Sequence, residues 1–151
     1  MMKLSQTELE EAIRAAGVHG CVECGKCVAI CPMQDMYANF SIDMSPRGMI
    51  KKSLFARDIL SDQNIWYCTE CNACTDICPE GVSCRDLIRS LRIMALEQGL
   101  VESVRKCSSC GGAFVSLPVL NYVEHRLKEK ALLALALCPS CRRETYFRRN
   151  A

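Results

Sequence analysis

One cysteine pattern occurs twice in this chain and limits what it can fold into. Four cysteines, separated by two, two and three residues and followed by proline, begin at Cys21 and again at Cys68, forty-seven positions later. A turn that gathers thiols this closely can wrap them around one inorganic centre, and thiolates are soft ligands that select transition metals. The repeat therefore predicts two metal sites, which use eight of the thirteen cysteines.

The spacing of each run is the one that holds a cubane 4Fe-4S cluster in two-cluster ferredoxins. Three thiolates of such a turn reach three irons, so the fourth iron needs a ligand from elsewhere. In those ferredoxins the fourth cysteine of each run ligates the other cluster. Carried over to this chain, the rule assigns Cys21, Cys24, Cys27 and Cys78 to one 4Fe-4S cluster, and Cys68, Cys71, Cys74 and Cys31 to the second.

Two other interpretations of these cysteines fit the sequence less well. Disulfides would require an oxidising compartment, but residues 1–17 contain no apolar signal-peptide core, and no span is long enough to cross a membrane. We therefore expect a cytoplasmic protein without a transmembrane segment. Zinc sites often use C-x2-C pairs, yet four cysteines packed in eleven residues and ending in Cys-Pro are not their usual spacing.

The segments around the two runs show helical periodicity. Helices are predicted over residues 5–16, from Pro46 to an exit at Asp62, and from about Cys84 to Gln98. No alternating strand pattern precedes residue 107. The fold class is therefore predicted to be mainly α, with a helical two-cluster ferredoxin domain over residues 1–103 and a small metal-knuckle domain, similar to a zinc ribbon, over residues 104–151.

A spacer of thirty-six residues separates the two runs, whereas small bacterial ferredoxins have little between theirs. Four motifs mark a different group: Cys21-Val-Glu-Cys-Gly-Lys-Cys-Val-Ala-Ile-Cys-Pro-Met33, Ser45-Pro-Arg47, Ile65-Trp-Tyr-Cys-Thr-Glu-Cys-Asn-Ala-Cys-Thr-Asp-Ile-Cys-Pro-Glu-Gly-Val82 and Leu91-Arg92. On these motifs, roughly residues 5 to 100 resemble the helical dicluster ferredoxins, and most closely the C subunit of heterodisulfide reductase.

The resemblance implies an electron relay within a hetero-oligomeric oxidoreductase complex. Its expected partners are flavin-bearing, hydrogenase-type or formate dehydrogenase-type subunits on one side and a catalytic reductase subunit on the other. The sequence contains no G-x-G-x-x-G, no P-loop and no Ser/His/Asp arrangement. We therefore expect a non-catalytic subunit. Its docking elements would be the helix over residues 5–16 and the Arg-rich end, which contains Arg142, Arg143, Arg148 and Arg149.

The C-terminal segment departs from this family and carries two further C-x2-C knuckles. Cys107 and Cys110 form the first knuckle, Cys138 and Cys141 form the second, and twenty-seven residues separate the two. Four thiolates from two knuckles make a tetrahedral site, for which zinc is the usual structural metal. A single iron, a 2Fe-2S cluster or free redox-active thiols are the alternatives, and iron would extend the electron path whereas zinc would not.

Two alternative functions follow from the remaining features. Cys84, at the predicted start of a helix, is either a small buried side chain or a reactive thiol. A thiol-redox or cofactor-reducing protein could use Cys84 or the C-terminal cysteines. A zinc-ribbon nucleic-acid-binding protein is the second alternative, but a formal charge of +2 and only Tyr146 and Phe147 beside the terminal arginines argue against it. No nucleic-acid partner is therefore expected.

Overall fold

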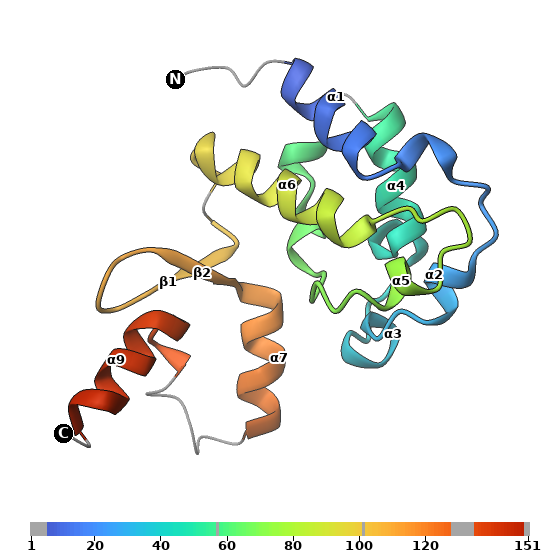
Figure 1. Cartoon of the computed structure of the whole chain (residues 1–151). Helices are drawn as coiled ribbons and strands as arrows, with labels where there is room; N and C mark the ends of the chain where they lie inside the picture. Colours follow the sequence, from blue (N-terminus) through green and yellow to red (C-terminus); the bar gives the residue numbers. More distant parts are fainter. Residues whose placement is uncertain (1–5, 57, 101, 128–134, 150–151) are drawn as a thin grey trace. The chain divides into compact units, whose positions relative to one another are not determined.

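The computed structural model describes residues 6–56, 58–100, 102–127 and 135–149 (Figure 1). The chain divides into two compact units, Met1–Leu100 and Val101–Ala151. Helices predominate, and the described residues contain a single sheet of two strands. The fold class is therefore mainly α. None of the described helices is both long and apolar enough to cross a membrane.

The first unit is built from short helices and single turns. Its α-helices are α1 (Gln6–Ala15), α2 (Lys26–Ala29), α3 (Met33–Met36), α4 (Pro46–Phe55), α5 (Ala73–Asp76) and α6 (Cys84–Glu97). Turns of 3-10 helix lie at Val18–Gly20, Ile42–Met44, Ile59–Ser61 and Gln63–Trp66. The helix predicted over residues 5–16 corresponds to α1, and Ser5 lies outside the described residues.

Helix α6 provides the central apolar face of the first unit. Ser83 caps its N-terminus by accepting a hydrogen bond from the amide of Asp86. At the other end, Gly99 adopts a left-handed conformation with φ 82°, which stops the helix. The side chains of Leu87, Ile88, Leu91 and Ala95 are fully buried. The predicted bounds and buried face of this helix are confirmed.

The helical segment predicted from Pro46 to Asp62 is interrupted, so this prediction was wrong in its second half. Helix α4 ends at Phe55, and Ala56 is extended. Ile59 then lies in a separate turn that packs against α6, where its side chain is 1% exposed. A continuous helix would have required the apolar residues on both sides of residue 56 to share one face, whereas burial against α6 required the chain to turn.

The sequence repeat is also a conformational repeat. Glu23 and Glu70, each two residues after the first cysteine of its run, both have φ 55°. Gly25 and Asn72 follow with φ 80° and 71°, and each precedes one of the short helices α2 and α5. Left-handed backbone at a residue other than glycine costs about 1–2 kcal/mol. The same unusual turn is therefore formed twice, at matching positions.

Segments distant in sequence join the two runs. The phenolic hydroxyl of Tyr37, after the first run, donates to the carbonyl oxygen of Tyr67, just before the second, at 3.1 Å. Their rings also meet edge to face, with centroids 5.1 Å apart. The amide of Ser83 donates to the carbonyl oxygen of Ala16 at 2.9 Å, which ties the chain after the second run to the end of α1. The first unit thus closes around both runs.

The second unit contains strands β1 (Val104–Lys106) and β2 (Ala113–Ser116), which pair antiparallel, followed by α7 (Leu117–Leu127) and α9 (Pro139–Arg149). Strand β1 precedes residue 107, contrary to the sequence prediction, because three residues are too few to show alternation. The Arg-rich end is helical, and this helix was not predicted. Its aromatic side chains, Tyr146 and Phe147, are exposed.

Gly48 on α4 allows a close approach of two backbones, and replacing it provides a test of the fold. A Cβ atom at this position would collide with the carbonyl oxygen of Ile42 and lie 2.9 Å from Cα of Asp43. We expect Gly48→Ala to lower the free energy of unfolding by about 1–3 kcal/mol, because backbone atoms cannot move aside cheaply. Urea unfolding of anaerobically purified protein measures this loss.

Gly20→Ala is the matched control, since a Cβ atom at Gly20 meets nothing within 4 Å. Equal stability of the two variants would contradict the close packing of α4 against the turn Ile42–Met44.

Candidate metal centres

Two cavities of the first unit are lined by the eight repeat cysteines. Cavity A is lined by Cys21, Cys24, Cys27 and Cys78, and also by Cys74. Cavity B is lined by Cys31, Cys68, Cys71 and Cys74. The last cysteine of each run therefore lies in the cavity of the other run. Each cavity thus includes the four cysteines that the sequence assigns to one cluster, and cavity A also includes Cys74 of the other set, so the assignment stays a prediction.

The two cavities share a wall and both reach the surface. Cys74 and Cys84 line both of them. At the outer sides, Cys24 of cavity A and Cys71 of cavity B are exposed. All thirteen cysteines lie in the described residues and are free thiols. Each cavity therefore combines at least four uncommitted cysteines with an exposed edge.

Burial makes several of these thiols poor acids unless a cation is present. It raises the pKa of Cys27, Cys31 and Cys68, the last to about 11. A buried thiolate requires compensation, and metal ions bind thiolates with release of the protons. Hydrogen bonds from backbone amides to sulfur supply part of this compensation. The amide of Glu70 donates to Sγ of Cys68 at 3.4 Å, and the amide of Val82 donates to Sγ of Cys78 at 3.3 Å. The donor set and its surroundings fit an iron–sulfur cluster in each cavity.

A helix anchors the glutamate of each run through a pair of cations. The carboxylate of Glu23 lies 2.6 Å from Arg47 and 2.9 Å from Lys51, both on α4. Hydrogen bonds from Lys51 and Arg47 lower the pKa of Glu23. Glu70 of the second run pairs in the same way with two arginines of α6. These contacts hold the left-handed turns of both runs in place.

Arg92 makes the most extensive of these contacts. Its guanidinium donates to the carboxylate of Glu70 at 2.6 Å and to the carbonyl oxygens of Ile65 and Cys68, and it lies 5.7 Å from the ring centroid of Trp66. Sequence reasoning missed the Glu–Arg pairs at both runs. The available signal was the repetition of glutamate at the third position of each run.

Cys84 lies at the boundary between the cavities. It is the first residue of α6, and its side chain is 3% exposed. Its thiol donates to the carbonyl oxygen of Pro46, with the Sγ and oxygen atoms 3.7 Å apart. Interaction between the neighbouring thiols of Cys84 and Cys74 lowers the pKa of Cys74 to about 7 and, together with burial, raises the pKa of Cys84. The interpretation of Cys84 as a small buried side chain is confirmed. A raised pKa and deep burial argue against a freely reactive thiol.

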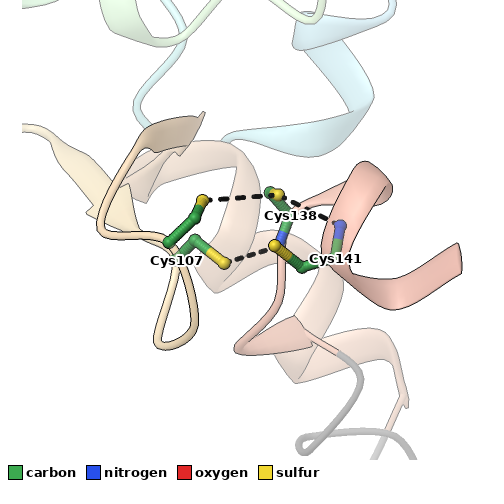
Figure 2. Close-up of side chains that lie close together, drawn as sticks. Cys107, Cys138 and Cys141 are labelled. Carbon is green, nitrogen blue, oxygen red and sulfur yellow. Dashed lines mark hydrogen bonds between the residues drawn. The ribbon is translucent and has the colours of Figure 1, made fainter. Parts of the chain in front are cut away.

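The four C-terminal cysteines converge in the second unit. Cys107 follows β1, Cys110 lies in the loop of the hairpin, and Cys138 and Cys141 lie at the start of α9. Figure 2 shows the side chains of Cys107, Cys138 and Cys141 pointing toward one another. The four Sγ atoms all lie within 4.8 Å of one another, and those of Cys110 and Cys138 are 3.9 Å apart. A tetrahedral zinc with Zn–S bonds of about 2.3 Å would separate its ligands by about 3.8 Å.

Backbone amides support this thiol cluster. The amide of Cys138 donates to Sγ of Cys107 at 3.3 Å, and the amide of Cys141 to Sγ of Cys138 at 3.5 Å. Hydrogen bonds from the amides of Cys138 and Cys110 lower the pKa of Cys107 to about 6. The site thus favours a thiolate before any metal binds, and the donor set fits one tetrahedral ion.

Comparison with known proteins agrees with the geometry of the first unit. Residues 17–82 match the family model of the 4Fe-4S dicluster domain. This segment includes both cysteine runs and the helical spacer between them.

Several curated proteins are similar to this chain over a longer region. The C subunit of a ferredoxin:CoB-CoM heterodisulfide reductase of Methanosarcina acetivorans is 38% identical over 85 residues, which cover 56% of this chain and 32% of the relative. A protein of Archaeoglobus profundus, itself described as similar to the C subunit of heterodisulfide reductase, is 32% identical over 108 residues, covering 66% and 55%. The C subunit of an H2:CoB-CoM heterodisulfide,ferredoxin reductase of Methanothermobacter marburgensis is 30% identical over 113 residues, covering 72% and 57%.

The chain thus spans between a third and somewhat more than half of the length of these relatives. The family match includes all eight cysteines of the repeat, and these cysteines line the paired cavities. Residues 17–82 match the 4Fe-4S dicluster domain, and the chain that contains them is similar to the C subunit of heterodisulfide reductase.

Proposed function

We propose that this chain is an electron-transfer subunit that binds two 4Fe-4S clusters. Cavity A would hold one through Cys21, Cys24, Cys27 and Cys78, and cavity B the other through Cys31, Cys68, Cys71 and Cys74. The observation that carries the proposal is the pair of adjacent cavities, each lined by three cysteines of one run and the last cysteine of the other, with Cys74 and Cys84 in both walls.

The arrangement of the cavities suits a relay. A bound 4Fe-4S cluster supplies the capacity to accept and release an electron at a potential that its surroundings set. The exposed residues Cys24 and Cys71 bring the outer side of each cavity to the surface, so a partner can approach each one. The shared wall keeps the inner sides close. Electrons would thus enter at one exposed cysteine and leave at the other.

The names of the relatives suggest the setting of this relay. They are C subunits of reductases that act on the CoB-CoM heterodisulfide, and their names include ferredoxin and H2. We propose a hetero-oligomeric, cytoplasmic complex in which flavin-bearing, hydrogenase-type or formate dehydrogenase-type subunits exchange electrons with a catalytic reductase subunit through this chain. The chain itself would supply no catalytic residue.

The C-terminal thiol cluster is proposed to bind one structural zinc ion through Cys107, Cys110, Cys138 and Cys141. The Sγ separation of 3.9 Å between the two knuckles supports a tetrahedral ion. A zinc ion there would fasten the loop after β1 to the start of α9 without taking part in electron transfer, because zinc has no redox chemistry.

The iron and zinc content of the purified protein tests both the two-cluster assignment and the zinc assignment. Anaerobically purified protein is expected to contain about eight iron atoms and about one zinc ion per chain, since each cube contributes four irons. Replacing Cys110 and Cys141 with serine is expected to remove the zinc and leave the iron. Nine or ten iron atoms without zinc would overturn the zinc assignment and extend the relay into the second unit.

The crossed ligand sets are tested by pairs of cysteine replacements. Cys31→Ala with Cys71→Ala removes two ligands from cavity B, so one intact cluster of about four irons should remain in cavity A. Cys31→Ala with Cys24→Ala removes one ligand from each cavity, so neither cluster should keep its full ligand set. Iron content and the EPR spectrum of the reduced protein distinguish the two variants.

Each double variant serves as the control for the other, because both lack the same number of thiols. If each run held its own cluster with its own four cysteines, the results would be exchanged: the Cys31 and Cys24 pair would leave one intact cluster, and the Cys31 and Cys71 pair would leave none.

A further inference from the structure

The charged side chains around cavity A have an excess of positive charge. The charged residues of a cavity are taken as those that line it and those that pair with a lining side chain. Glu23, Lys26 and Arg47 line cavity A, and Lys51 lies 2.9 Å from the carboxylate of Glu23. Three cations and one carboxylate give this cavity a net charge of +2.

Cavity B is electrically balanced by the same criterion. Glu70 and Arg85 line it, as does the uncharged residue Asn72. The charged partners of these three residues are Arg89, Arg92, Asp86 and Asp76. Three cations therefore meet three carboxylates around cavity B, and only cavity A has an excess of positive charge.

Two positions of the sequence repeat contribute to this difference. Lys26 of the first run is exposed, and the matching position of the second run is Ala73. Val22 is 60% exposed, and its counterpart is Thr69. Both residues line cavity A beside Cys24, which is itself exposed. The opening of cavity A thus combines an exposed apolar side chain with exposed positive charge around a proposed cluster ligand.

Such an opening fits a partner whose own surface is acidic. Encounters between electron-transfer proteins bury little area, so charge guides them more than a broad apolar face does. Opposite charges raise the rate of association, and added salt screens this effect. Arg47 and Lys51 are both held on α4 by Glu23, so a partner meets a preformed set of cations.

We propose that Val22, Lys26, Arg47 and Lys51 around Cys24, together called opening A, form the docking surface for an electron-carrier protein with acidic residues around its redox group. In each exchange one electron passes between the carrier and the cluster in cavity A, so one is oxidised as the other is reduced, and no bond or proton changes. This inference rests on the proposed function and names the class of partner at one end of the relay.

Two c-type cytochromes serve as probes, one acidic and one basic, because both accept one electron at a haem and differ in surface charge. The reduced full-length protein is mixed anaerobically with each ferric cytochrome, and the haem absorbance follows the transfer of one electron from cluster to haem iron. At low salt we expect the acidic cytochrome to react about tenfold faster than the basic one, and to slow as salt is added. Equal rates, or no slowing in salt, would overturn the proposal without any substitution.

Lys26→Ala gives the first run the residue that the second run has, and Lys26→Glu reverses the charge. We expect the rate with the acidic cytochrome to fall about threefold and about tenfold, respectively, because each weakens the attraction at opening A. The rate with the basic cytochrome should rise in Lys26→Glu, which a merely structural defect would not produce.

Arg85→Ala is the matched control, since it removes one positive charge from the lining of cavity B and lowers the net charge of the chain equally. It should leave the rate with the acidic cytochrome unchanged. If Arg85→Ala and Lys26→Ala slowed this reaction equally, the net charge of the chain rather than opening A would govern it, and the proposal would fail.

The wild-type protein separates this inference from the function on which it rests. If it shows the EPR signals of two 4Fe-4S clusters but reacts with both cytochromes at the same rate, the relay survives and the docking surface does not. If those two signals are missing, the proposed function fails before any cytochrome is added.

Discussion

The structure of the first unit depends on an exchange of cysteines between its two runs. Cys31 closes the cavity of the second run, and Cys78 closes the cavity of the first. Neither run can complete a four-thiol cavity alone, so the spacer must fold back and bring the runs together. The burial of α6, the contact of Tyr37 with Tyr67 and the hydrogen bond from Ser83 to Ala16 all serve this closure.

The two halves around the cavities are built alike but held by different elements. Each run has a left-handed glutamate, and two cations of one helix anchor each carboxylate, from α4 at Glu23 and from α6 at Glu70. The strain of these turns persists because such contacts determine the backbone around them. The halves meet at the shared wall, where Cys84, the first residue of α6, lines both cavities together with Cys74 of the second run.

Sequence periodicity predicted those helices whose burial follows one face. The bounds of α6 and its buried leucines agree with the prediction, as does α1 over its described residues. The end of α4 at Phe55 was missed because packing of Ile59 against α6 overrides local periodicity. Helix α9 and the Glu–Arg anchors were also missed. Charged side chains on an exposed surface leave no apolar period, and a pairing across nineteen or more positions has no local signal.

Cysteine spacing alone was enough to predict the number and kind of the proposed metal sites, because the spacing of thiols along a tight turn limits the inorganic centre that they can surround. The apolar period of α1 and α6 was likewise enough to predict the helical class. The folded chain was needed to show that the two cavities share Cys74 and Cys84, and that Cys24 and Cys71 lie at the surface. Those features depend on how distant segments pack, and packing is a property of the assembled side chains rather than of local spacing.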